Sequence, residues 1–394
     1  MIPYSRQSIS ESDIAAVDGV LRSPFLTQGP EVPRFEAAIR DFCGAGHAVA
    51  ACNATAALHI ACLALGLGPG KSLWTSPVTF VASANCALYC GAGIDFVDID
   101  ERTGNMCMAA LERKLQDAEK SGRLPAIVVP VHLAGLPCDL ERLKKLAGQY
   151  GFRILEDASH ALGATYRDER IGNGRWSDAA VFSFHPVKMI ATGEGGMVLT
   201  NDADLAGKLR MLGNHGITRD AGQFTEPSHG PWYYQQQLLG YNYRLTDLQA
   251  ALGTSQMSRL ADFLRIRGTL ADRYDQLLAG LPLQTPARLP GASSSWHLYI
   301  VQLTDPALPL AGLYQELRRR GVGVQLHYIP VHLQPYYGAL GFKPGDFPSA
   351  EKYYRRAMSL PLFPNLEAGE QEFVAETLRQ TLADFAKEAL PTNA

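Results

Sequence analysis

The chain has 394 residues, of which 46% are hydrophobic and 19% charged, and its formal net charge is -3 at pH 7. This composition excludes an intrinsically disordered protein, and the length favours two domains over one. The small negative charge offers no footprint for a polyanion, so we expect no nucleic-acid partner. No apolar run approaches the roughly 18 to 20 residues of a membrane span, and the first residues do not resemble a secretory signal. We therefore expect a cytoplasmic protein with no membrane partner.

Short apolar runs alternate with amphipathic helical stretches from about residue 47 to residue 200. Strands are expected at residues 48–52, 72–75, 93–97, 126–131, 153–156, 179–184 and 197–200. Helices are expected at residues 54–65, 80–89, 108–121, 139–150 and 204–214. This alternation is typical of an α/β protein with a mainly parallel sheet between helices, whose ligands bind beyond the carboxyl ends of the strands.

The last third of the chain has a different pattern. A long helical stretch is expected over residues 246–281, and the prolines after it mark a joint. Beyond the joint we expect strands at residues 297–303 and 323–326 and helices at residues 310–320 and 371–390. This order predicts a smaller α+β domain. We place the large domain at residues 1–260 and the small C-terminal domain at residues 261–394.

The seven cysteines are scattered and include no C-x-x-C pair. An odd number of dispersed cysteines favours buried free thiols in a reducing compartment over a disulfide framework. Cys86 and Cys90 lie one helical turn apart, but no second Cys or His pair nearby would complete a zinc site. His327 and His332 also lie close together in the sequence without a third ligand. We expect no bound metal.

Lys188 is the most informative residue. It follows an apolar run that ends at Ser183, and Pro186 between them cannot continue a strand. A glycine-rich turn at residues 193–196 then leads into the next apolar run. An amine is thus placed on the rim of a sheet, where it can condense with an aldehyde to form a Schiff base. An isolated loop lysine is usually solvated, so its role depends on the groups around it.

Other strand ends carry polar groups as well. The apolar run at residues 153–157 ends in Asp157, and the turn at residues 52–58 leads from a strand into a helix. The N-terminus of that helix offers free backbone N–H groups and the Thr55 hydroxyl, which suit an anion. Phe80 follows a further strand. Taken singly, Asp157 and Thr55 are expected helix caps and Phe80 is an expected core residue.

Pyridoxal phosphate would use all of these groups at once. Its aldehyde needs an amine such as Lys188, and its pyridine nitrogen needs a carboxylate such as Asp157 so that the ring acts as an electron sink. Its phosphate needs a helix N-terminus with hydroxyls, and its ring face needs a flat partner such as Phe80. Because the turn at residues 193–196 lacks the dinucleotide spacing, a nicotinamide cofactor is disfavoured.

The same segments resemble those of the DegT-type nucleotide-sugar aminotransferases, a branch of the fold-type I pyridoxal phosphate enzymes. The resemblance extends from residue 4 to about residue 340 and is carried by residues 25–30, 53–58, 79–85, 156–161, 183–196 and 240–247. Residues 183–188 and 325–332 are most similar to the C4 aminotransferases of pseudaminic acid biosynthesis. Residues 52–54 depart from the family, in which many members carry Asn-Gly before the threonine, but the backbone N–H groups remain.

The resemblance implies a fold-type I transferase that aminates C4 of a UDP-linked 2-acetamido-2,6-dideoxy-4-keto hexose. The product would be UDP-4-amino-4,6-dideoxy-N-acetyl-β-L-altrosamine, and L-glutamate would be the amino donor. It also implies a homodimer with shared active sites.

The resemblance implies roles for individual residues. Lys188 would form the Schiff base and transfer the proton, and Asp157 would pair with the ring nitrogen. Phe80 would stack on the ring, and His160 would lie near its hydroxyl. The phosphate would be held by Ala54, Thr55, Ala56 and Ser183 of one subunit and by Asn242 of the other. The substrate would contact Tyr4, Pro24, Phe25, Leu26, Thr27, Gln325, Leu326, His327 and Tyr328. An ordinary strand and proline turn would explain residues 325–328 equally well.

Other functions remain open at this point. A sister enzyme could act on a perosamine-type or a 4-amino-arabinose-type keto sugar. A sugar 3-dehydratase of the same fold would replace the Schiff-base lysine, usually by histidine, so Lys188 argues against it. A nicotinamide-dependent sugar oxidoreductase would need a glycine-rich turn after a first strand. A regulatory protein with an inactive fold would lack Lys188 or Asp157, and both are present.

Overall fold

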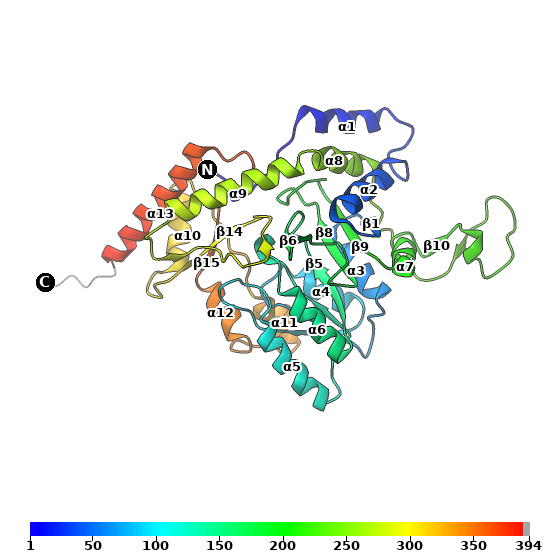
Figure 1. Ribbon diagram of the computed structural model, residues 1–394, viewed down its shortest axis with the longest axis horizontal. Coiled ribbons are helices and arrows are strands. Elements are labelled where there is room, and N and C mark those ends of the chain that lie inside the picture. The colour runs from blue at the N-terminus through cyan, green and yellow to red at the C-terminus, as the bar shows by residue number, and fades with distance from the viewer. Residues whose placement is uncertain (389–394) are drawn as a thin grey trace.

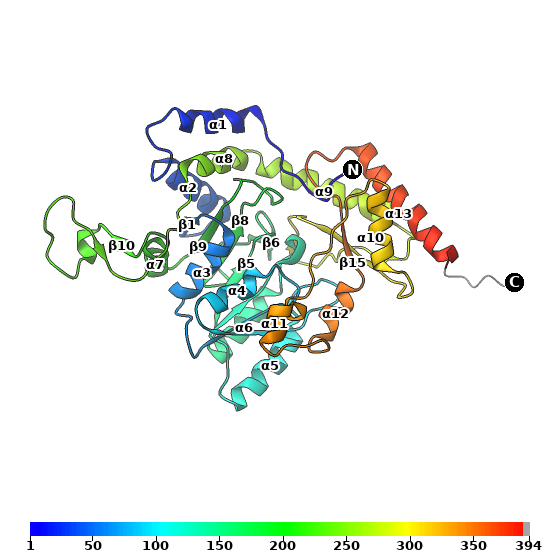
Figure 2. The ribbon, with the colours of Figure 1, turned by 180° about the vertical axis from the view of Figure 1, so that it is seen from behind.

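The computed structural model describes residues 1–388 (Figures 1 and 2). Its centre is a seven-stranded sheet in the order β1-β9-β8-β5-β4-β2-β3. Neighbouring strands run parallel, except that β9 is antiparallel to both β1 and β8. The expected α/β class with a mainly parallel sheet is confirmed.

Each strand and helix expected in the first 214 residues is present within two residues of its expected ends. The strands of the large sheet are β1 (His47–Ala51), β2 (Ser72–Thr75), β3 (Gly93–Phe96), β4 (Ile127–Val129), β5 (Arg153–Asp157), β8 (Ala179–Ser183) and β9 (Gly196–Thr200). The expected helices are α3 (Ala54–Ala64), α4 (Ala82–Tyr89), α5 (Met108–Lys120), α6 (Leu140–Tyr150) and α7 (Ala203–Gly213). No residue ranges were predicted for the two N-terminal helices, α1 (Glu11–Leu21) and α2 (Glu31–Cys43).

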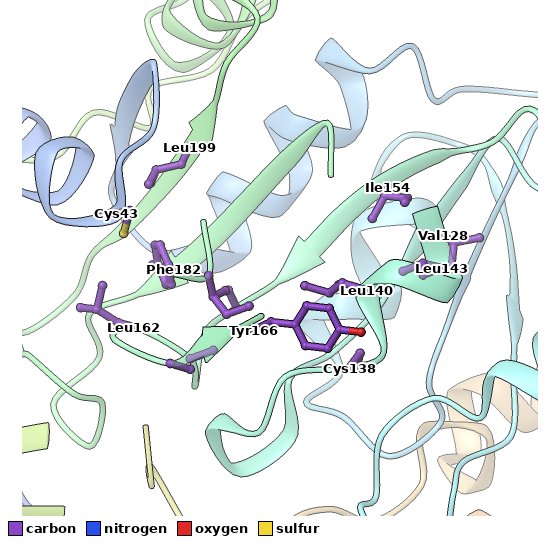
Figure 3. Packing of buried hydrophobic residues seen from close by; sticks show 14 of the residues in the cluster. Cys43, Val128, Cys138, Leu140, Leu143, Ile154, Leu162, Tyr166, Phe182 and Leu199 are labelled. Atoms are coloured by element: carbon purple, nitrogen blue, oxygen red, sulfur yellow. The ribbon is translucent and has the colours of Figure 1, made fainter. Parts of the chain in front are cut away.

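Both faces of the sheet are covered, which is why its strands are apolar at almost every position. Figure 3 shows Ile154, Phe182 and Leu199 from three neighbouring strands in one cluster with Leu140 and Leu143 of α6. The strand residues one position away, such as Leu155, Val181 and Val198, belong to a second cluster with residues of α3, α4 and α7. Successive side chains of a strand point to opposite faces, so each strand contributes to both clusters.

The helical stretch expected at residues 246–281 is two helices, which corrects the single-helix prediction. They are α8 (Asp247–Met257) and α9 (Leu260–Leu277). The chain leaves the helical hydrogen-bond pattern at Ser258 and Arg259, and the Arg259 guanidinium donates to the Ser8 carbonyl and pairs with Asp13 of the N-terminal segment. The break therefore lies where the helix is tied to the first residues of the chain.

The C-terminal part contains a small antiparallel sheet of β12 (Leu283–Gln284), β14 (Tyr299–Leu303) and β15 (Ala357–Leu360), with α10 (Leu310–Arg319) and α13 (Ala368–Glu388) beside it. The expected strand at residues 323–326 is wrong. Only Gln325 pairs, in an isolated bridge to Ser359, because Gly323 donates instead to the Ile2 carbonyl at 2.7 Å. Residues 389 and 390 of the expected C-terminal helix lie outside the described residues.

Short elements complete the fold. They are β6 (Thr165–Tyr166), β7 (Glu169–Arg170), β10 (Ile217–Thr218), β11 (Gln235–Gln236), β13 (Ala292–Ser293), α11 (Pro335–Ala339), α12 (Pro348–Tyr354) and the 3-10 turns η1 (Leu133–Gly135), η2 (Ala221–Gln223) and η3 (Val331–Leu333). The segment that carries β10 and β11 projects from the body as an arm, at the opposite end of the molecule from α13 (Figures 1 and 2). None of the helices in residues 1–388 combines the length and apolar character needed to cross a bilayer.

Candidate active site

The topology of the sheet brings the predicted residues to one edge. β5 and β8 are parallel neighbours, so Asp157 at the end of β5 and Ser183 at the end of β8 reach the same edge. A cavity of about 480 Å³ lies there. The predicted site residues that line it are Tyr4, Ala54, Thr55, Phe80, Asp157, His160, Ser183, Lys188, His327 and Tyr328. Groups from distant parts of the sequence thus share one cavity.

Lys188 lies half-buried in the wall of this cavity. Burial lowers its pKa from 10.5 to about 8, although the Asp157 carboxylate opposes the shift. A larger fraction of the amine is therefore neutral near physiological pH than for an exposed lysine. A neutral amine is the form that attacks an aldehyde.

Asp157 is buried and held by two donors. The Ser83 hydroxyl donates to Oδ2 at 2.5 Å, and the Ser159 backbone N–H donates to Oδ1 at 3.1 Å. The Thr79 hydroxyl lies 2.7 Å from Ser83 and fixes that side chain in turn. These bonds fix the orientation of the carboxylate at the cavity wall, as a partner for a protonated ring nitrogen requires.

The N-terminus of α3 forms another part of the wall. Asn53 caps the helix by accepting a hydrogen bond from the Ala56 N–H at 2.8 Å. Gly196 of β9 packs against this turn, where a Cβ atom would come within 2.5 Å of the Asn53 carbonyl carbon and the Ala54 nitrogen. Only glycine allows the strand to pass so closely. The N-terminus of α3 is therefore held rigidly, with Thr55 at the cavity, and has the geometry that suits an anion.

Three buried histidines border the cavity, and a fourth, the exposed His185, lines it as well. The rings of His160 and His297 lie 4.3 Å apart, and His327 contacts the Ser359 hydroxyl through Nδ1 at 2.7 Å. Burial is the main cause that lowers the pKa of all three, with the neighbouring Lys188 adding to it, and the pKa of His327 falls to about 3. These three buried imidazoles are therefore neutral and add hydrogen-bonding rings, not positive charges, to the cavity wall.

Several predicted residues lie away from the cavity. Asn242 is exposed on the segment that joins the arm to the body, where it forms a bridge with Asn214. The loop at residues 24–27 is exposed, and its first two residues line a separate hollow beside α1 and α8. Gln325 is exposed and Leu326 is half-buried. The N–H of Ala56 already donates to Asn53. For these residues the expected contacts stay predictions.

Sequence reasoning missed several groups that the structure brings to the site. Asn53 had a readable signal, because Asn immediately before a helix is a typical N-cap. Ser83 lies in the first turn of α4, three residues after Phe80, and could have been considered as a partner for a buried acid. His297 had no local signal. It comes from the C-terminal part of the chain and enters the site only through tertiary packing.

The arrangement of these groups fits pyridoxal phosphate. A shielded amine, a fixed carboxylate and the N-terminus of a helix share one cavity, and Phe80 lies at its rim with the Tyr328 ring 6.3 Å away. When bound, the cofactor supplies an aldehyde that carries the amino group and a ring that withdraws electrons.

The family model described as the DegT/DnrJ/EryC1/StrS aminotransferase family matches residues 7–379. The chain belongs to this family. Among curated proteins, the spore coat polysaccharide biosynthesis protein SpsC of Bacillus subtilis is 39% identical over 383 residues, which cover 96% of each chain.

Solved structures agree with this assignment. Helicobacter pylori PseC, an aminotransferase involved in the biosynthesis of pseudoaminic acid, has a TM-score of 0.88 at 30% identity, covering 97% of this chain and 99% of that chain. The PLP form of Spr1654 from Streptococcus pneumoniae has a TM-score of 0.87 at 28% identity, covering 98% and 99%. The chain is thus a pyridoxal phosphate-dependent nucleotide-sugar aminotransferase with the fold of fold-type I enzymes. The oxidoreductase alternative is excluded.

Proposed function

We propose that this enzyme aminates C4 of a UDP-linked 2-acetamido-2,6-dideoxy-hexos-4-ulose in pseudaminic acid biosynthesis, with L-glutamate as the amino donor. The product would be UDP-4-amino-4,6-dideoxy-N-acetyl-β-L-altrosamine. The likeness to PseC over nearly the whole chain supports this substrate. The observation that carries the proposal is that His327 and Tyr328, from a segment most similar to the enzymes of that pathway, line the cavity together with Lys188.

The residues would then act in two half-reactions. Lys188 Nζ takes a proton from the α-carbon of the amino donor in the first and delivers a proton to C4 of the sugar in the second. Asp157, held by Ser83 and Ser159, keeps the ring nitrogen protonated throughout. Burial lowers the pKa of His160, His297 and His327, which makes them weak bases, so Lys188 would be the group that moves protons.

We further propose a homodimer in which Asn242 completes the phosphate site of the neighbouring subunit. Among the residues that line the cavity, no arginine is present and Lys188 is the sole lysine. The cofactor phosphate and a UDP group would together bring several negative charges. Hydrogen-bond donors from a second subunit, such as Asn242, would help to hold these negative groups. The arm also exposes large apolar side chains that suit a contact between subunits: Trp232, Tyr234 and Leu239. The seven free cysteines support a reducing, cytoplasmic location.

A second candidate is C4 amination of another keto sugar nucleotide, of the perosamine or the 4-amino-arabinose type. The observation that favours it is the higher identity to SpsC, 39%, than to PseC, 30%. SpsC is described only by its part in a spore coat polysaccharide.

Direct assay separates these candidates. Purified holoenzyme is incubated with L-glutamate and with each keto sugar nucleotide in turn, and the products are identified by mass spectrometry. We expect the UDP-linked 2-acetamido-4-keto sugar to gain an amino group in step with formation of 2-oxoglutarate. Lys188→Ala is the control and should give no product. Faster conversion of a perosamine-type or arabinose-type substrate would reject the proposed substrate and keep the enzyme class.

A further inference from the structure

We propose that Ser5 is a positioning residue for Lys188: its hydroxyl holds the peptide group that precedes the lysine and so sets the direction of the amine. Ser5 and Val187 are 182 residues apart in the sequence, and Ser5 does not line the cavity. The inference rests on the role of Lys188 in the proposed function and adds a residue that acts on the lysine from outside the cavity.

The peptide group between Val187 and Lys188 is held at both of its polar atoms. The Ser5 hydroxyl donates to the Val187 carbonyl oxygen at 3.2 Å. The Lys188 N–H donates to the His185 carbonyl oxygen at 2.8 Å. Because a peptide group is planar, these two bonds together fix the plane from which the Lys188 Cα and its side chain extend. Among residues 1–388, the Ser5 hydroxyl is the only donor to the Val187 oxygen.

The sequence around the lysine supplies only one of these two bonds. The bond from Lys188 to His185 closes a four-residue turn with Pro186 at its second position, where proline is favoured. Met189 and Ile190 are buried in the core and hold the chain after the lysine. The carbonyl before the lysine has no partner within its own loop. It is held from the N-terminal segment instead.

Ser5 can hold this peptide group because its own segment is fixed on both sides. Before Ser5, the Gly323 N–H donates to the Ile2 carbonyl at 2.7 Å. The Leu362 N–H donates to the Tyr4 carbonyl at 3.0 Å. These bonds tie the segment to the C-terminal part of the chain. Ser5 itself is only 7% exposed, and a buried hydroxyl loses free energy without an acceptor, so its bond to the lysine loop persists.

The other side of the segment is fixed at the break between α8 and α9. The Ser8 carbonyl accepts hydrogen bonds from the Gln256 side chain at 2.9 Å and from the Arg259 guanidinium at 3.0 Å. Asp13, which is buried, pairs with Arg259 as well and accepts a bond from Gln256 at 2.7 Å. Residues 2–8 are therefore held between the C-terminal part of the chain and the helix break, and the Ser5 hydroxyl is a fixed point between these two anchors.

Covalent capture of pyridoxal phosphate by cofactor-free enzyme tests this role. The amine condenses with the aldehyde and releases one water molecule, so the rate depends on the direction from which the amine attacks. Stopped-flow absorbance is recorded at pH 9, above the Lys188 pKa of about 8, where most of the amine is neutral. The rate at saturating cofactor reports bond formation, and the half-saturating concentration reports the binding that precedes it.

In Ser5→Ala the saturating rate should fall about tenfold, because the amine is no longer held in the direction of attack. The half-saturating concentration should change less than about twofold, since Ser5 does not line the cavity. Ser5→Thr keeps a hydroxyl and should restore the rate. Ser8→Ala is the matched control, since it keeps the Ser8 carbonyl and removes a hydroxyl that makes no hydrogen bond within residues 1–388. Both of its constants should equal those of the wild type.

Each outcome decides. An unchanged saturating rate in Ser5→Ala would overturn the inference, as would an equal loss in Ser8→Ala or in Ser5→Thr. A change in the half-saturating concentration alone would assign Ser5 to cofactor binding, which also overturns it. Circular dichroism and thermal unfolding verify that the variants are folded.

Borohydride reduction followed by peptide mass spectrometry shows which lysine holds the cofactor. Attachment to a lysine other than Lys188 would reject the proposed role of Lys188, and this inference with it. Attachment to Lys188 at an unchanged rate in Ser5→Ala would reject only the part assigned to Ser5. The substrate proposal fails independently, because it is tested by product identity and this inference by rates recorded with no sugar present.

Discussion

At the scale of single residues, the reactivity of the site depends on how burial changes the charge of an amine that lies close to an acid. Lys188 loses solvation in the cavity wall, which favours its neutral form, while Asp157 partly restores the charged form. Asp157 itself is held by hydrogen bonds from Ser83 and Ser159. A single cavity thus holds a reactive amine beside a carboxyl group that is fixed in position.

The rate of cofactor uptake should show this balance. Only the neutral amine attacks the aldehyde, so uptake by cofactor-free enzyme should accelerate roughly tenfold per pH unit up to about pH 8, the pKa of Lys188, and then level off. Stopped-flow absorbance measures this directly. Asp157→Asn removes the charge that raises the pKa, so its plateau should begin at lower pH. A plateau above pH 10 in the wild type, as for an exposed lysine, would contradict the argument.

At the scale of elements, the contact between β9 and the start of α3 shapes the proposed phosphate site. Gly196→Ala would place a Cβ atom against the backbone of Asn53 and Ala54. Because backbone cannot move aside cheaply, the N-terminus of α3 should shift and the affinity for pyridoxal phosphate should fall at least about tenfold. Equilibrium titration of cofactor-free enzyme measures the change.

Gly207→Ala is the matched control for that substitution. Gly207 lies within α7, and a Cβ atom there would meet no atom within 4 Å. The variant should bind the cofactor normally and unfold at slightly higher denaturant, since alanine favours a helix by about 1 kcal/mol over glycine. Equal cofactor affinity in both alanine variants would show that the close contact at Gly196 does not shape the site.

Arg267 on α9 connects that helix to the C-terminal part of the chain. It is fully buried, and its guanidinium donates to the carbonyls of Trp296, His297 and Leu362. Arg267→Leu leaves these oxygens unpaired and should lower the free energy of unfolding by about 3 kcal/mol, measured by urea denaturation. Arg265→Leu, two residues away and exposed, should change it by less than about 0.5 kcal/mol. Similar losses in both variants would contradict this role.

At the scale of the whole molecule, the arm that carries β10 and β11 extends from the body far from α13 (Figure 1). Leu239 on this arm is 80% exposed. If the arm packs on a second subunit, Leu239→Asp should raise the dimer dissociation constant at least about tenfold, since it would bury a charge in an apolar contact. Sedimentation velocity measures this. Phe373→Asp on α13, 48% exposed, is the control and should leave the assembly unchanged.

Much of the fold could be predicted from the sequence, because strands buried on both faces and amphipathic helices leave strong periodic patterns. Asp157 and Lys188 could be placed at one edge of the sheet because Asp157 ends one apolar strand and Lys188 follows the end of the next by five residues. Predictions from local sequence patterns were wrong where tertiary contacts determine the backbone conformation. The backbone of Gly323 pairs with the N-terminus and not with a sheet, and the helix break at Ser258 has no proline or glycine to mark it.

The same limit applies to the site. His297 reaches it from the C-terminal part of the chain, and the pairing of Tyr328 with His160 joins segments that no periodicity relates. The placing of Asn242 and of residues 24–27 at a shared active site depends on a second subunit, so it stays a prediction. The division into domains at residues 260 and 261 also stays a prediction, since this point falls at the start of α9.

The adjacency of β5 and β8 has a consequence for how the enzyme matures. Pairing between β5 and β8 brings the acid and the amine together. A partly folded chain in which these strands are not yet paired therefore has no binding site for vitamin B6. During refolding with the cofactor present, the yellow colour should therefore appear after the helices form and report when the sheet is complete.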